Sequence, residues 1–480
     1  MNSRTKIVAT LGPASSGPEV LRKLLSAGVD VVRLNLSHGD VADHVALLKL
    51  VRVLATELQI AVAVLADLPG PKVRSGQFPV GGVDLRTGDY TVLVAAQDSV
   101  STSSLITVEY PSLAQDLSVG DRVVLGDGAI SLAVDRIDEL GHVYCVILTG
   151  GRLQGRPGVH LPSERLRLTT PTQEDLVLAA VMADAGADYL AVSFVRSAAD
   201  LRAVRESLAP RTVRLIAKVE TLSAVEALAE IAAEADGVMV ARGDLGIECP
   251  LEDVPHLQKQ IIRHCVEEGV PVITATQVLE SMITSPSPTR AEVTDIANAV
   301  FDGTDALMLS AETAVGIDPV GVVETMHRVA ARAEMEASYS QWAVRLGRTQ
   351  RLNWASAPDR ITMALTHAAG LAAIDAGADA ILCCTRSGRT ATAMARFRPT
   401  VKLIGLSPDA GTVRALALSW GVVALQVDTY TSTDQLVWHA VETAVRSGHV
   451  QPGQTVLVLA GAPDGASGAS TDVLRIVRVS

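Results

Sequence analysis

The sequence predicts an α/β protein: a (β/α)8 TIM barrel with an inserted small β-barrel lid domain and a C-terminal α/β domain. Three observations predict this fold class. Eight short apolar runs alternate with helical stretches, most runs end in a polar or charged residue, and one gap between runs is much longer than the others. Continuous runs of Val, Ile, Leu and Ala are typical of strands that are buried on both faces and therefore parallel.

The predicted strands occupy the first two thirds of the chain and begin at Lys6, Val29, Ala61, Asp188, Arg214, Gly237, Pro271 and Ala306. In a (β/α)8 barrel the carboxyl ends of all strands meet at one mouth, where the chemistry takes place. We therefore expect the polar residues at the ends of the runs to converge there: Arg33, Asn35, Ser37, Asp67, Lys218, Glu220, Asp244, Thr276, Ser310 and Glu312.

The long gap between the third and fourth runs predicts a separate domain. From about Gly70 to Thr169, apolar and polar residues alternate between Gly and Asp turns, which is typical of antiparallel strands. An insertion at the mouth of a barrel is well placed to act as a lid. After the eighth run, helices and strands alternate again, as in a doubly wound sheet. We expect the barrel at 1–69 and 169–344, the lid at 70–168 and the C-terminal effector domain at 345–480.

The composition argues against several classes of protein. The chain has 480 residues, of which 48% are hydrophobic, so two or three domains are expected. A net charge of −12 and an aromatic content of 3% argue against a nucleic-acid partner. No run approaches about 18 apolar residues, so no membrane span is expected. The five cysteines have no paired spacing and the N-terminal segment lacks a signal-peptide pattern, which predicts a cytoplasmic protein.

Two carboxylates at the ends of neighbouring predicted strands form a candidate metal site. Glu220 and Asp244 suit one hard cation, Mg²⁺ or Mn²⁺, with substrate and water completing the octahedron. Lys218 lies two residues before Glu220 and points to the same side of its strand, where an ammonium suits charge spread over phosphoryl oxygens. The alternative for the carboxylates is an ion pair with Lys218 or Arg242, and the alternative for Lys218 is a solvated surface lysine.

Other polar residues near the mouth are candidate contacts for an anionic substrate. Arg33 and Arg74 bracket the mouth and suit bidentate binding of phosphate. The backbone of the turn that begins at Gly243 and the hydroxyl of Thr276 are weaker candidates. The alternative for Thr276 is helix capping. A cluster of oxygen ligands that suits a monovalent cation or a metal-bound phosphate comprises Asn35, Ser37 and Asp67. The alternative for this cluster is loop capping.

The C-terminal domain contains a second candidate anion site. The segment TRSGRT follows a predicted strand, opens a helix, and comprises Thr385, Arg386, Ser387, Gly388, Arg389 and Thr390. Hydroxyls, two arginines and a glycine at a helix start favour phosphate binding. Because the segment is far in sequence from the barrel, it predicts a regulatory site, with ordinary capping as the alternative.

Taken together, these segments resemble the pyruvate kinase family over essentially the whole chain. The matching strings are TKIVATLGPAS, VVRLNLSHGD, ADLPGPKVRSG, IAKVET, VMVARGDLGIE, ITATQVLESM, PSPTRAEVTDIANAVFDGTDALMLSAET and TRSGRT. The resemblance implies that phosphate is transferred from phosphoenolpyruvate to ADP, giving pyruvate and ATP, with Mg²⁺ or Mn²⁺ as cofactor. It also implies a homotetramer and a phosphorylated allosteric effector.

The resemblance implies roles for individual residues. Lys218 is implied to stabilise the transferring phosphoryl group, Glu220 and Asp244 to bind the divalent ion, and Arg33 to hold the substrate phosphate. The groups implied to hold the substrate carboxylate are Gly243, Asp244 and Thr276. The groups implied to take part in protonating the enolate are Thr276, Ser310 and Glu312. The groups implied to face the nucleotide are Asn35, His38 and Arg74.

The chain departs from the family pattern in three places. Lys72 stands where potassium-dependent members have Glu, so its fixed charge is expected to replace K⁺ and make K⁺ dispensable. A residual monovalent site would use Asn35, Ser37, Asp67 and Leu68. The lid loses a nucleotide-contacting lysine, for which Arg156 is the expected substitute. The loop from Gly461 lacks the Trp and Arg that some members use for fructose 1,6-bisphosphate, so the effector is left open between a sugar monophosphate and AMP.

Two other functions remain open at this point. A Mg²⁺-enolate aldolase or lyase also uses Glu and Asp at adjacent strand ends, but it needs neither Lys218 nor Arg74. A weakly active paralog that senses metabolites is the second alternative, because the lid and Lys72 depart from the family pattern.

Overall fold

The centre of the molecule is a closed barrel of eight parallel strands. The computed structural model describes residues 3–96, 99–126, 128, 130–162, 167, 169–353, 360–429, 432–461 and 471–480. Around the barrel the order is β1, β2, β3, β12, β13, β14, β15 and β16, and β16 pairs with β1. These strands span Lys6–Thr10, Val31–Asn35, Ala63–Asp67, Tyr189–Val192, Arg214–Val219, Gly237–Ala241, Val272–Ala275 and Ala306–Leu309. The predicted barrel and all eight of its strands are confirmed.

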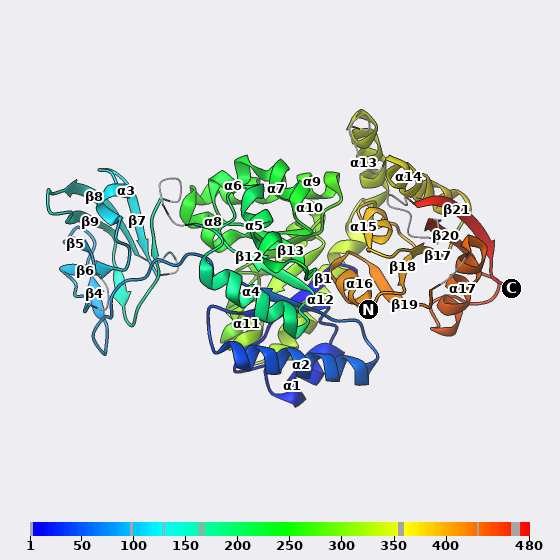
Figure 1. The fold of residues 1–480 in the computed structure, drawn as a ribbon, viewed down its shortest axis with the longest axis horizontal. Helices are drawn as coiled ribbons and strands as arrows, with labels where there is room; N and C mark the ends of the chain where they lie inside the picture. Colours follow the sequence, from blue (N-terminus) through cyan, green and yellow to red (C-terminus); the bar gives the residue numbers. More distant parts are fainter. Residues whose placement is uncertain are drawn as a thin grey trace.

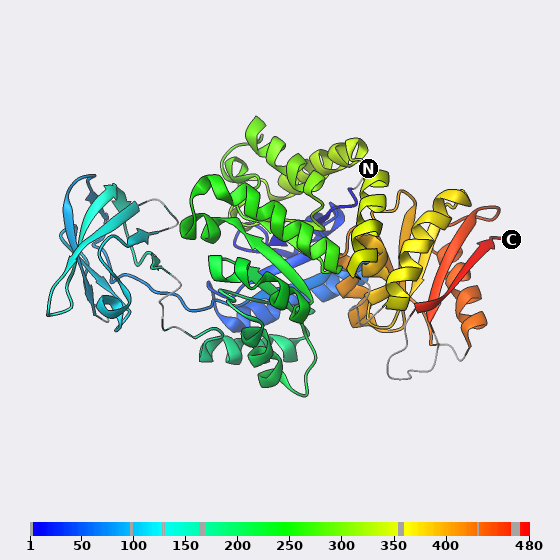
Figure 2. The same cartoon turned by 90° about the horizontal axis from the view of Figure 1, so that it is seen from above.

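Helices cover the outside of the barrel (Figures 1 and 2). They are α1 (Pro18–Ser26), α2 (Val41–Leu58), α4 (Gln173–Ala185), α5 (Ala198–Leu208), α6 (Leu222–Glu226), α7 (Leu228–Glu234), α8 (Arg242–Glu248), α9 (Val254–Glu268), α10 (Arg290–Asp302), α11 (Ala311–Ala314) and α12 (Pro319–Glu336), with 3₁₀ turns η2 (Leu251–Asp253) and η3 (Glu280–Ile283). Capping boxes fix three starts: Thr172 with Asp175 for α4, Ser197 with Asp200 for α5 and Thr289 with Glu292 for α10. Among the described helices, none is long and apolar enough to cross a membrane.

The segment between β3 and α4 folds as a small β unit at one end of the molecule (Figure 1, left). A six-stranded sheet has the order β11, β7, β8, β9, β5, β6, and β4 pairs with β10. The pairing of β5 with β6 is parallel, and the other ladders of this unit are antiparallel. Its elements are β4 (Val83–Leu85), β5 (Tyr90–Ala95), β6 (Leu105–Val108), α3 (Leu113–Asp116), β7 (Arg122–Leu125), β8 (Ile130–Ile137), β9 (Val143–Thr149), β10 (Gly151–Leu153) and β11 (Val159–His160).

A short segment joins the two edges of this six-stranded sheet. Arg74 forms a bridge with Gly158, next to β11, and Ser75 forms a bridge with Val108 of β6. Hydrogen bonds from Val159 N–H to the Val73 carbonyl (2.9 Å) and from Gly76 N–H to the Thr107 carbonyl (2.8 Å) extend both contacts. The strands therefore close into the small barrel that the sequence predicts, and the closing segment is the one that leaves the large barrel after β3.

The last part of the chain forms a five-stranded sheet with the order β19, β18, β17, β20, β21 (Figure 1, right). The ladders are parallel except for β20 with β21. The order reverses between β17 and β20, as in a doubly wound sheet. The elements are α13 (Tyr339–Asn353), α14 (Arg360–Asp375), β17 (Ala380–Cys384), α15 (Arg389–Ala395), β18 (Lys402–Ser407), α16 (Ala410–Ala415), η4 (Leu416–Leu418), β19 (Val422–Gln426), α17 (Thr433–Arg446), β20 (Thr455–Gly461) and β21 (Thr471–Arg478).

The C-terminal sheet and the barrel share an apolar core. The side chains that fill the barrel interior, among them Leu65, Ile216 and Met239, form one cluster with Ala417 and Leu418 of η4. Leu418 is fully buried. The turn η4 thus closes the amino-terminal end of the barrel, opposite the mouth, because the starts of the parallel strands meet at that end.

Polar contacts hold the same interface together. The buried carboxylate of Asp188, just before β12, accepts a hydrogen bond from Arg414 of α16 at 2.8 Å. Asp305, just before β16, pairs with the fully buried Arg398 at 2.8 Å. Both carboxylates lie just before barrel strands. In these two pairs the C-terminal part therefore contacts the end of the barrel that lies away from the mouth.

Candidate active site

A cavity of about 370 Å³ opens where the carboxyl ends of the barrel strands meet. Its wall combines the ends of β2, β12 and β13 with the segments that enter and leave the inserted β unit, including residues 71–74 and 158–161. The insertion therefore lines the cavity directly, as expected of a lid. The predicted residues on the wall are Arg33, Asn35, Ser37, His38, Lys72, Arg74, Lys218, Glu220 and Asp244.

Lys218 lies at the centre of a buried cluster of oxygen atoms. Its Nζ is 2.7 Å from Ser193 Oγ, 2.9 Å from Glu220 Oε1 and 3.3 Å from Asp67 Oδ1. Burial alone would lower the pKa of Lys218, but the charges of Asp67 and Glu220 outweigh it and raise the pKa above its ordinary value. Lys218 is therefore a fixed cation at neutral pH, and the alternative of a solvated surface lysine is excluded.

Arg33 and Asp67 form a second ion pair beside Lys218. The guanidinium of Arg33 contacts Asp67 Oδ2 at 2.7 Å and donates to Thr10 Oγ1 at 3.0 Å. Burial would raise the pKa of Asp67, which is 1% exposed, but Lys218 and Arg33 outweigh burial and lower that pKa. Asp67 is thus an ionised carboxylate that orients two cations toward the cavity.

The two carboxylates predicted to bind a metal have an environment that favours a cation. Glu220 is 1% exposed, and its Oε2 accepts the Phe194 N–H at 2.6 Å. Burial has the largest effect on Glu220 and raises its pKa. The charge of Lys218 lowers this pKa, and the charge of Asp244 raises it. Because the pKa stays above its ordinary value, the protein compensates the charge of the Glu220 carboxylate only in part. Within the described residues, no group of three or more His, Cys, Asp or Glu side chains forms a metal site alone. Two hard oxygen donors of this kind fit a Mg²⁺ ion that takes its other ligands from substrate and water.

The structure corrects one of the alternatives considered for these carboxylates. Arg242, at the start of α8, pairs with Asp295 at 2.7 Å instead of with Glu220 or Asp244. It also donates to the carbonyl oxygens of Ala275 (3.1 Å) and Thr276 (2.6 Å). Arg242 therefore ties the end of β15 to the start of α8.

Thr276 and Gly243 lie together, next to Asp244 of the cavity wall. The Thr276 hydroxyl accepts the Gly243 N–H at 2.9 Å and donates to the Ala275 carbonyl at 2.7 Å. Thr276 has φ of 67°, and Gln277 has φ of 53°. Two consecutive non-glycine residues in the left-handed region are costly and mark a constrained loop, which is typical of functional sites.

Ser310 and Glu312 lie beneath the mouth rather than on the cavity wall. Glu312 is 2% exposed, and its two oxygens accept the N–H groups of Leu279 (3.1 Å) and Ser310 (2.7 Å). Its carboxylate thereby joins the loops that follow β15 and β16. The Ser310 hydroxyl is buried and has no hydrogen-bond partner among the described residues. Their direct role in proton transfer stays a prediction.

The predicted nucleotide contacts divide into two groups. Asn35, His38 and Arg74 lie on the cavity wall. The guanidinium of Arg156 instead pairs with Glu109 of the inserted unit, while the Arg156 carbonyl accepts a hydrogen bond from Arg74 at 3.3 Å. Arg156 is therefore not part of the cavity wall.

Two of the oxygen atoms predicted for a monovalent cation accept hydrogen bonds from the protein. Asn35 Oδ1 accepts the Ser37 N–H at 3.2 Å, and the Leu68 carbonyl accepts the Ser193 hydroxyl at 2.8 Å. Asp67 is neutralised by Arg33 and Lys218, as described above. Lys72 adds a further cation on the wall. Loss of surrounding water, together with the charges of Lys218 and Arg74, lowers the pKa of Lys72, whereas Asp67 and Asp244 oppose this effect.

Three wall residues after β12 were missed by the sequence analysis: Ser193, Phe194 and Arg196. The rule that strand ends carry chemistry would have found Ser193, because it lies near the end of the fourth predicted run, DYLAVSFV, and directly after β12. Ser193 also explains Gly70, whose φ is +68° and where an added Cβ would lie 2.7 Å from the Ser193 Cβ. Only glycine lets the chain turn toward the insertion at this point.

The predicted effector segment lies at the other end of the molecule. The Thr385 hydroxyl accepts the Gly388 N–H at 3.0 Å, so the segment forms a tight turn before α15. Thr390 contacts Thr471, at the start of β21, at 2.6 Å between hydroxyl oxygens. Apart from Gly461, the loop expected to lack the Trp and Arg lies outside the described residues.

Comparison with known proteins gives one consistent family. Residues 2–323 match a family model described as the barrel domain of pyruvate kinase, and residues 363–477 match one described as its alpha/beta domain. The chain is 39% identical over 484 residues to a pyruvate kinase of Geobacillus stearothermophilus, covering 100% of this chain and 81% of the relative. It is 40% identical over 479 residues to pyruvate kinase 2 of Synechocystis sp., covering 98% and 79%.

Proposed function

The chain belongs to the pyruvate kinase family, and we propose that the buried cluster around Lys218 is where it transfers the phosphoryl group of phosphoenolpyruvate to ADP. The family reaction gives pyruvate and ATP, and its members generally use Mg²⁺. The observation that carries the assignment of the site is the arrangement of one ammonium and two carboxylates, Asp67 and Glu220, on a cavity shared with the lid.

The roles follow from charge and position. Lys218 would stabilise the negative charge that spreads over the phosphoryl oxygens during transfer, because its own charge is fixed by two carboxylates. Arg33, oriented by Asp67, would bind the phosphate of the substrate. Glu220 and Asp244 would hold the divalent ion, which supplies further positive charge at the transferring group when bound.

The remaining substrate contacts are proposed from position alone. The amides of Gly243 and Asp244 and the Thr276 hydroxyl would hold the substrate carboxylate, and Thr276 would lie near the enolate as it gains a proton. Support for this comes from the constrained loop at Thr276 and from its contact with Gly243. Glu312 would act by positioning this loop through the N–H of Leu279.

The experiment that tests this site is the variant Lys218→Met. We expect ATP formation from phosphoenolpyruvate and ADP to be abolished, while circular dichroism and Mg²⁺ binding by calorimetry remain close to wild type. Lys259→Met is the matched control, because Lys259 on α9 is half-exposed and pairs with Asp302. A Lys218→Met enzyme that kept most of its kcat would remove the proposed role of Lys218.

We propose that activity does not require K⁺. Lys72 lies on the cavity wall, and the oxygens of Asn35, Asp67 and Leu68 already have partners. The side chain of Lys72 on this wall and the pairing of Asp67 with Arg33 and Lys218 leave little need for a monovalent cation. Steady-state assays with K⁺ replaced by tetramethylammonium test this, and a strong dependence of kcat on K⁺ would contradict it.

The effector segment, the homotetramer and the cytoplasmic location remain predictions from the sequence. The five cysteines are buried and free, which is compatible with a reducing compartment. Native mass spectrometry tests the oligomeric state. The family match leaves no separate support for an aldolase or lyase, and the intact cluster at Lys218 argues against a weakly active paralog.

A further inference from the structure

One buried carboxylate joins the two segments that connect the barrel with the inserted β unit. Asp175, in the first turn of α4, is 2% exposed. Its Oδ1 accepts the N–H of Gly70, in the segment that enters the insertion, at 2.9 Å. Its Oδ2 accepts the N–H of Thr172 at 2.8 Å and the Thr172 hydroxyl at 2.7 Å, in the segment that returns from the insertion. Both connections are therefore fixed to the start of the same barrel helix.

The bond between Asp175 and Gly70 is not required for capping the helix. In a capping box, the third helical residue returns a hydrogen bond to the N–H of the capping residue. Asp200, at the same position of α5, bonds the N–H groups of Arg196 and Ser197 through a single oxygen, at 2.8 and 3.0 Å. Asp175 uses its other oxygen for Gly70, which lies 105 residues earlier in the chain. The contact with Gly70 is therefore a tertiary link between the lid connection and the barrel.

Gly70 packs against two residues that hold the cluster around Lys218. An added Cβ at Gly70 would lie 2.7 Å from the Ser193 Cβ and 3.0 Å from the Phe194 Cδ2. Ser193 Oγ accepts the Lys218 ammonium at 2.7 Å. The Phe194 N–H donates to the Glu220 carboxylate at 2.6 Å. This close packing means that the entering segment cannot shift toward the barrel without displacing Ser193 and Phe194.

A hydrogen bond ties the same entering segment to Ser193. The Ser193 hydroxyl donates to the carbonyl of Leu68, two residues before Gly70, at 2.8 Å. This acceptor fixes the direction of the hydroxyl, so that the lone pairs of its oxygen face the Lys218 ammonium. Phe194 has φ of 53°, a costly conformation for a non-glycine residue that persists only while the surrounding contacts hold it. The position of the entering segment therefore determines how Ser193 meets Lys218.

We propose that Asp175 is a positioning residue for phosphoryl transfer, which holds the entering segment of the lid against Ser193 and thereby fixes the place of Lys218. The path between them runs through Gly70 and Leu68, and each step is a hydrogen bond, a packing contact or the chain itself. A movement of the lid that pulls on Gly70 is resisted at Asp175 instead of being passed on to Lys218. The inference rests on the proposed function, because it assigns Asp175 a part in the reaction at Lys218.

The test is a double-mutant cycle on kcat, measured as ATP formation at saturating phosphoenolpyruvate, ADP and Mg²⁺. Asp175→Ala removes all three hydrogen bonds of the carboxylate, and we expect kcat to fall by about three- to tenfold with little change in KM. Ser193→Ala removes the end of the same path. The loss in the double variant should therefore fall well short of the product of the two single losses.

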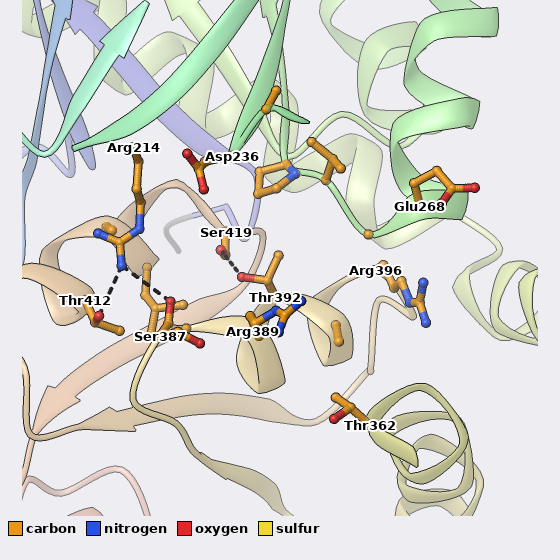
Figure 3. Close-up of a pocket in the computed structure, with 18 of the residues that line it drawn as sticks. Arg214, Asp236, Glu268, Thr362, Ser387, Arg389, Thr392, Arg396, Thr412 and Ser419 are labelled. Carbon is orange, nitrogen blue, oxygen red and sulfur yellow. Dashed lines mark hydrogen bonds between the residues drawn. The ribbon is translucent and has the colours of Figure 1, made fainter. Parts of the chain in front are cut away.

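Ser419→Ala is the matched control for the cycle, because Ser419 is also a serine that is 2% exposed. It contacts Thr392 at 3.2 Å in the cavity between the barrel and the C-terminal part, at the end of the barrel away from the mouth (Figure 3). Combining it with Asp175→Ala should leave kcat at the value of Asp175→Ala alone. Thr172→Ala is the control for capping: it weakens the start of α4 but keeps the bond to Gly70, so the urea midpoint should fall while kcat stays close to wild type.

Three outcomes would overturn the proposal. Wild-type kcat in Asp175→Ala would show that the carboxylate does not act on the reaction. Losses that multiply in the cycle with Ser193→Ala would show that Asp175 acts independently of that hydroxyl. A loss of kcat in Thr172→Ala as large as in Asp175→Ala would assign the effect to helix capping. If Asp175→Ala does not fold, Asp175→Asn takes its place in the cycle, because its single acceptor oxygen cannot serve both segments.

Hydrogen exchange gives a readout that does not need turnover. The amides of residues 66–72 should exchange about tenfold faster or more in Asp175→Ala than in wild type, and at the wild-type rate in Ser419→Ala. Unchanged exchange in Asp175→Ala would refute the anchoring of the entering segment, whatever the activity. A wild-type chain that formed no ATP from phosphoenolpyruvate and ADP would instead refute the proposed function, and faster exchange would still support the anchoring.

Discussion

Asp67→Asn perturbs the cluster around Lys218 through one of its two buried carboxylates. Asp67 is 1% exposed and contacts Arg33 at 2.7 Å and Lys218 at 3.3 Å. The amide has nearly the same shape but no charge, so two buried cations would be left with Glu220 as their nearest buried anion. Removing one partner of a buried ion pair costs about 3–5 kcal/mol, and we expect the free energy of unfolding in urea to fall by about 3 kcal/mol.

The same variant changes the pH dependence of catalysis. Asp67 is the largest of the charges that raise the pKa of Lys218. A raised pKa means that the charge of Lys218 is retained at neutral pH and is lost only as the pH rises through the folded-state value. Without Asp67 that pKa falls, so the alkaline decline of kcat should begin at a lower pH than in wild type.

Asp184→Asn is the control for this experiment. Asp184 also pairs with an arginine, Arg211 at 2.5 Å, but its side chain is 60% exposed. Exposed ion pairs contribute about 1 kcal/mol or less, so this variant should unfold close to wild type. An Asp67→Asn enzyme with wild-type stability and an unshifted alkaline decline would refute the reasoning about the cluster.

Three further predictions concern other parts of the molecule. Ser193→Ala removes one of three oxygens that hold Lys218, so kcat in a coupled assay should fall by about tenfold with little change in KM; an unchanged kcat would show that Ser193 does not position Lys218. Glu220→Gln should weaken Mg²⁺ binding by about tenfold or more in calorimetry, and equal affinity would place the metal elsewhere. Leu418→Ala should lower the free energy of unfolding by about 2–5 kcal/mol, whereas Leu140→Ala, 82% exposed, should not.

The sequence predicted the barrel well because its signals are local. Each strand is a continuous apolar run, and the strand direction alone determines that Lys218, Glu220 and Asp244 face one mouth. The ion pair between Arg33 and Asp67 was not predicted, because it depends on how β2 and β3 are registered against each other. The register of these two strands follows from packing around the whole barrel rather than from the sequence of either strand.

Other features depend on contacts that no local pattern encodes. Glu312 ends a predicted strand, yet its carboxylate accepts hydrogen bonds from backbone N–H groups and is not part of the cavity wall. The packing of Leu418 against the barrel interior joins segments that are far apart in the chain. From the sequence alone, an apolar residue at this position is equally compatible with the core of the C-terminal part. Long-range packing determines the position of both Glu312 and Leu418.

The turn η4 also has a consequence for how this protein can be divided. Because Ala417 and Leu418 belong to the same apolar cluster as Leu65 and Met239, the floor of the barrel is built from the C-terminal third of the chain. A fragment that stopped after α12 would expose a hole lined with apolar side chains to solvent. The barrel is therefore not an independent module, and proteolytic trimming could not separate it from the C-terminal part without exposing these apolar side chains.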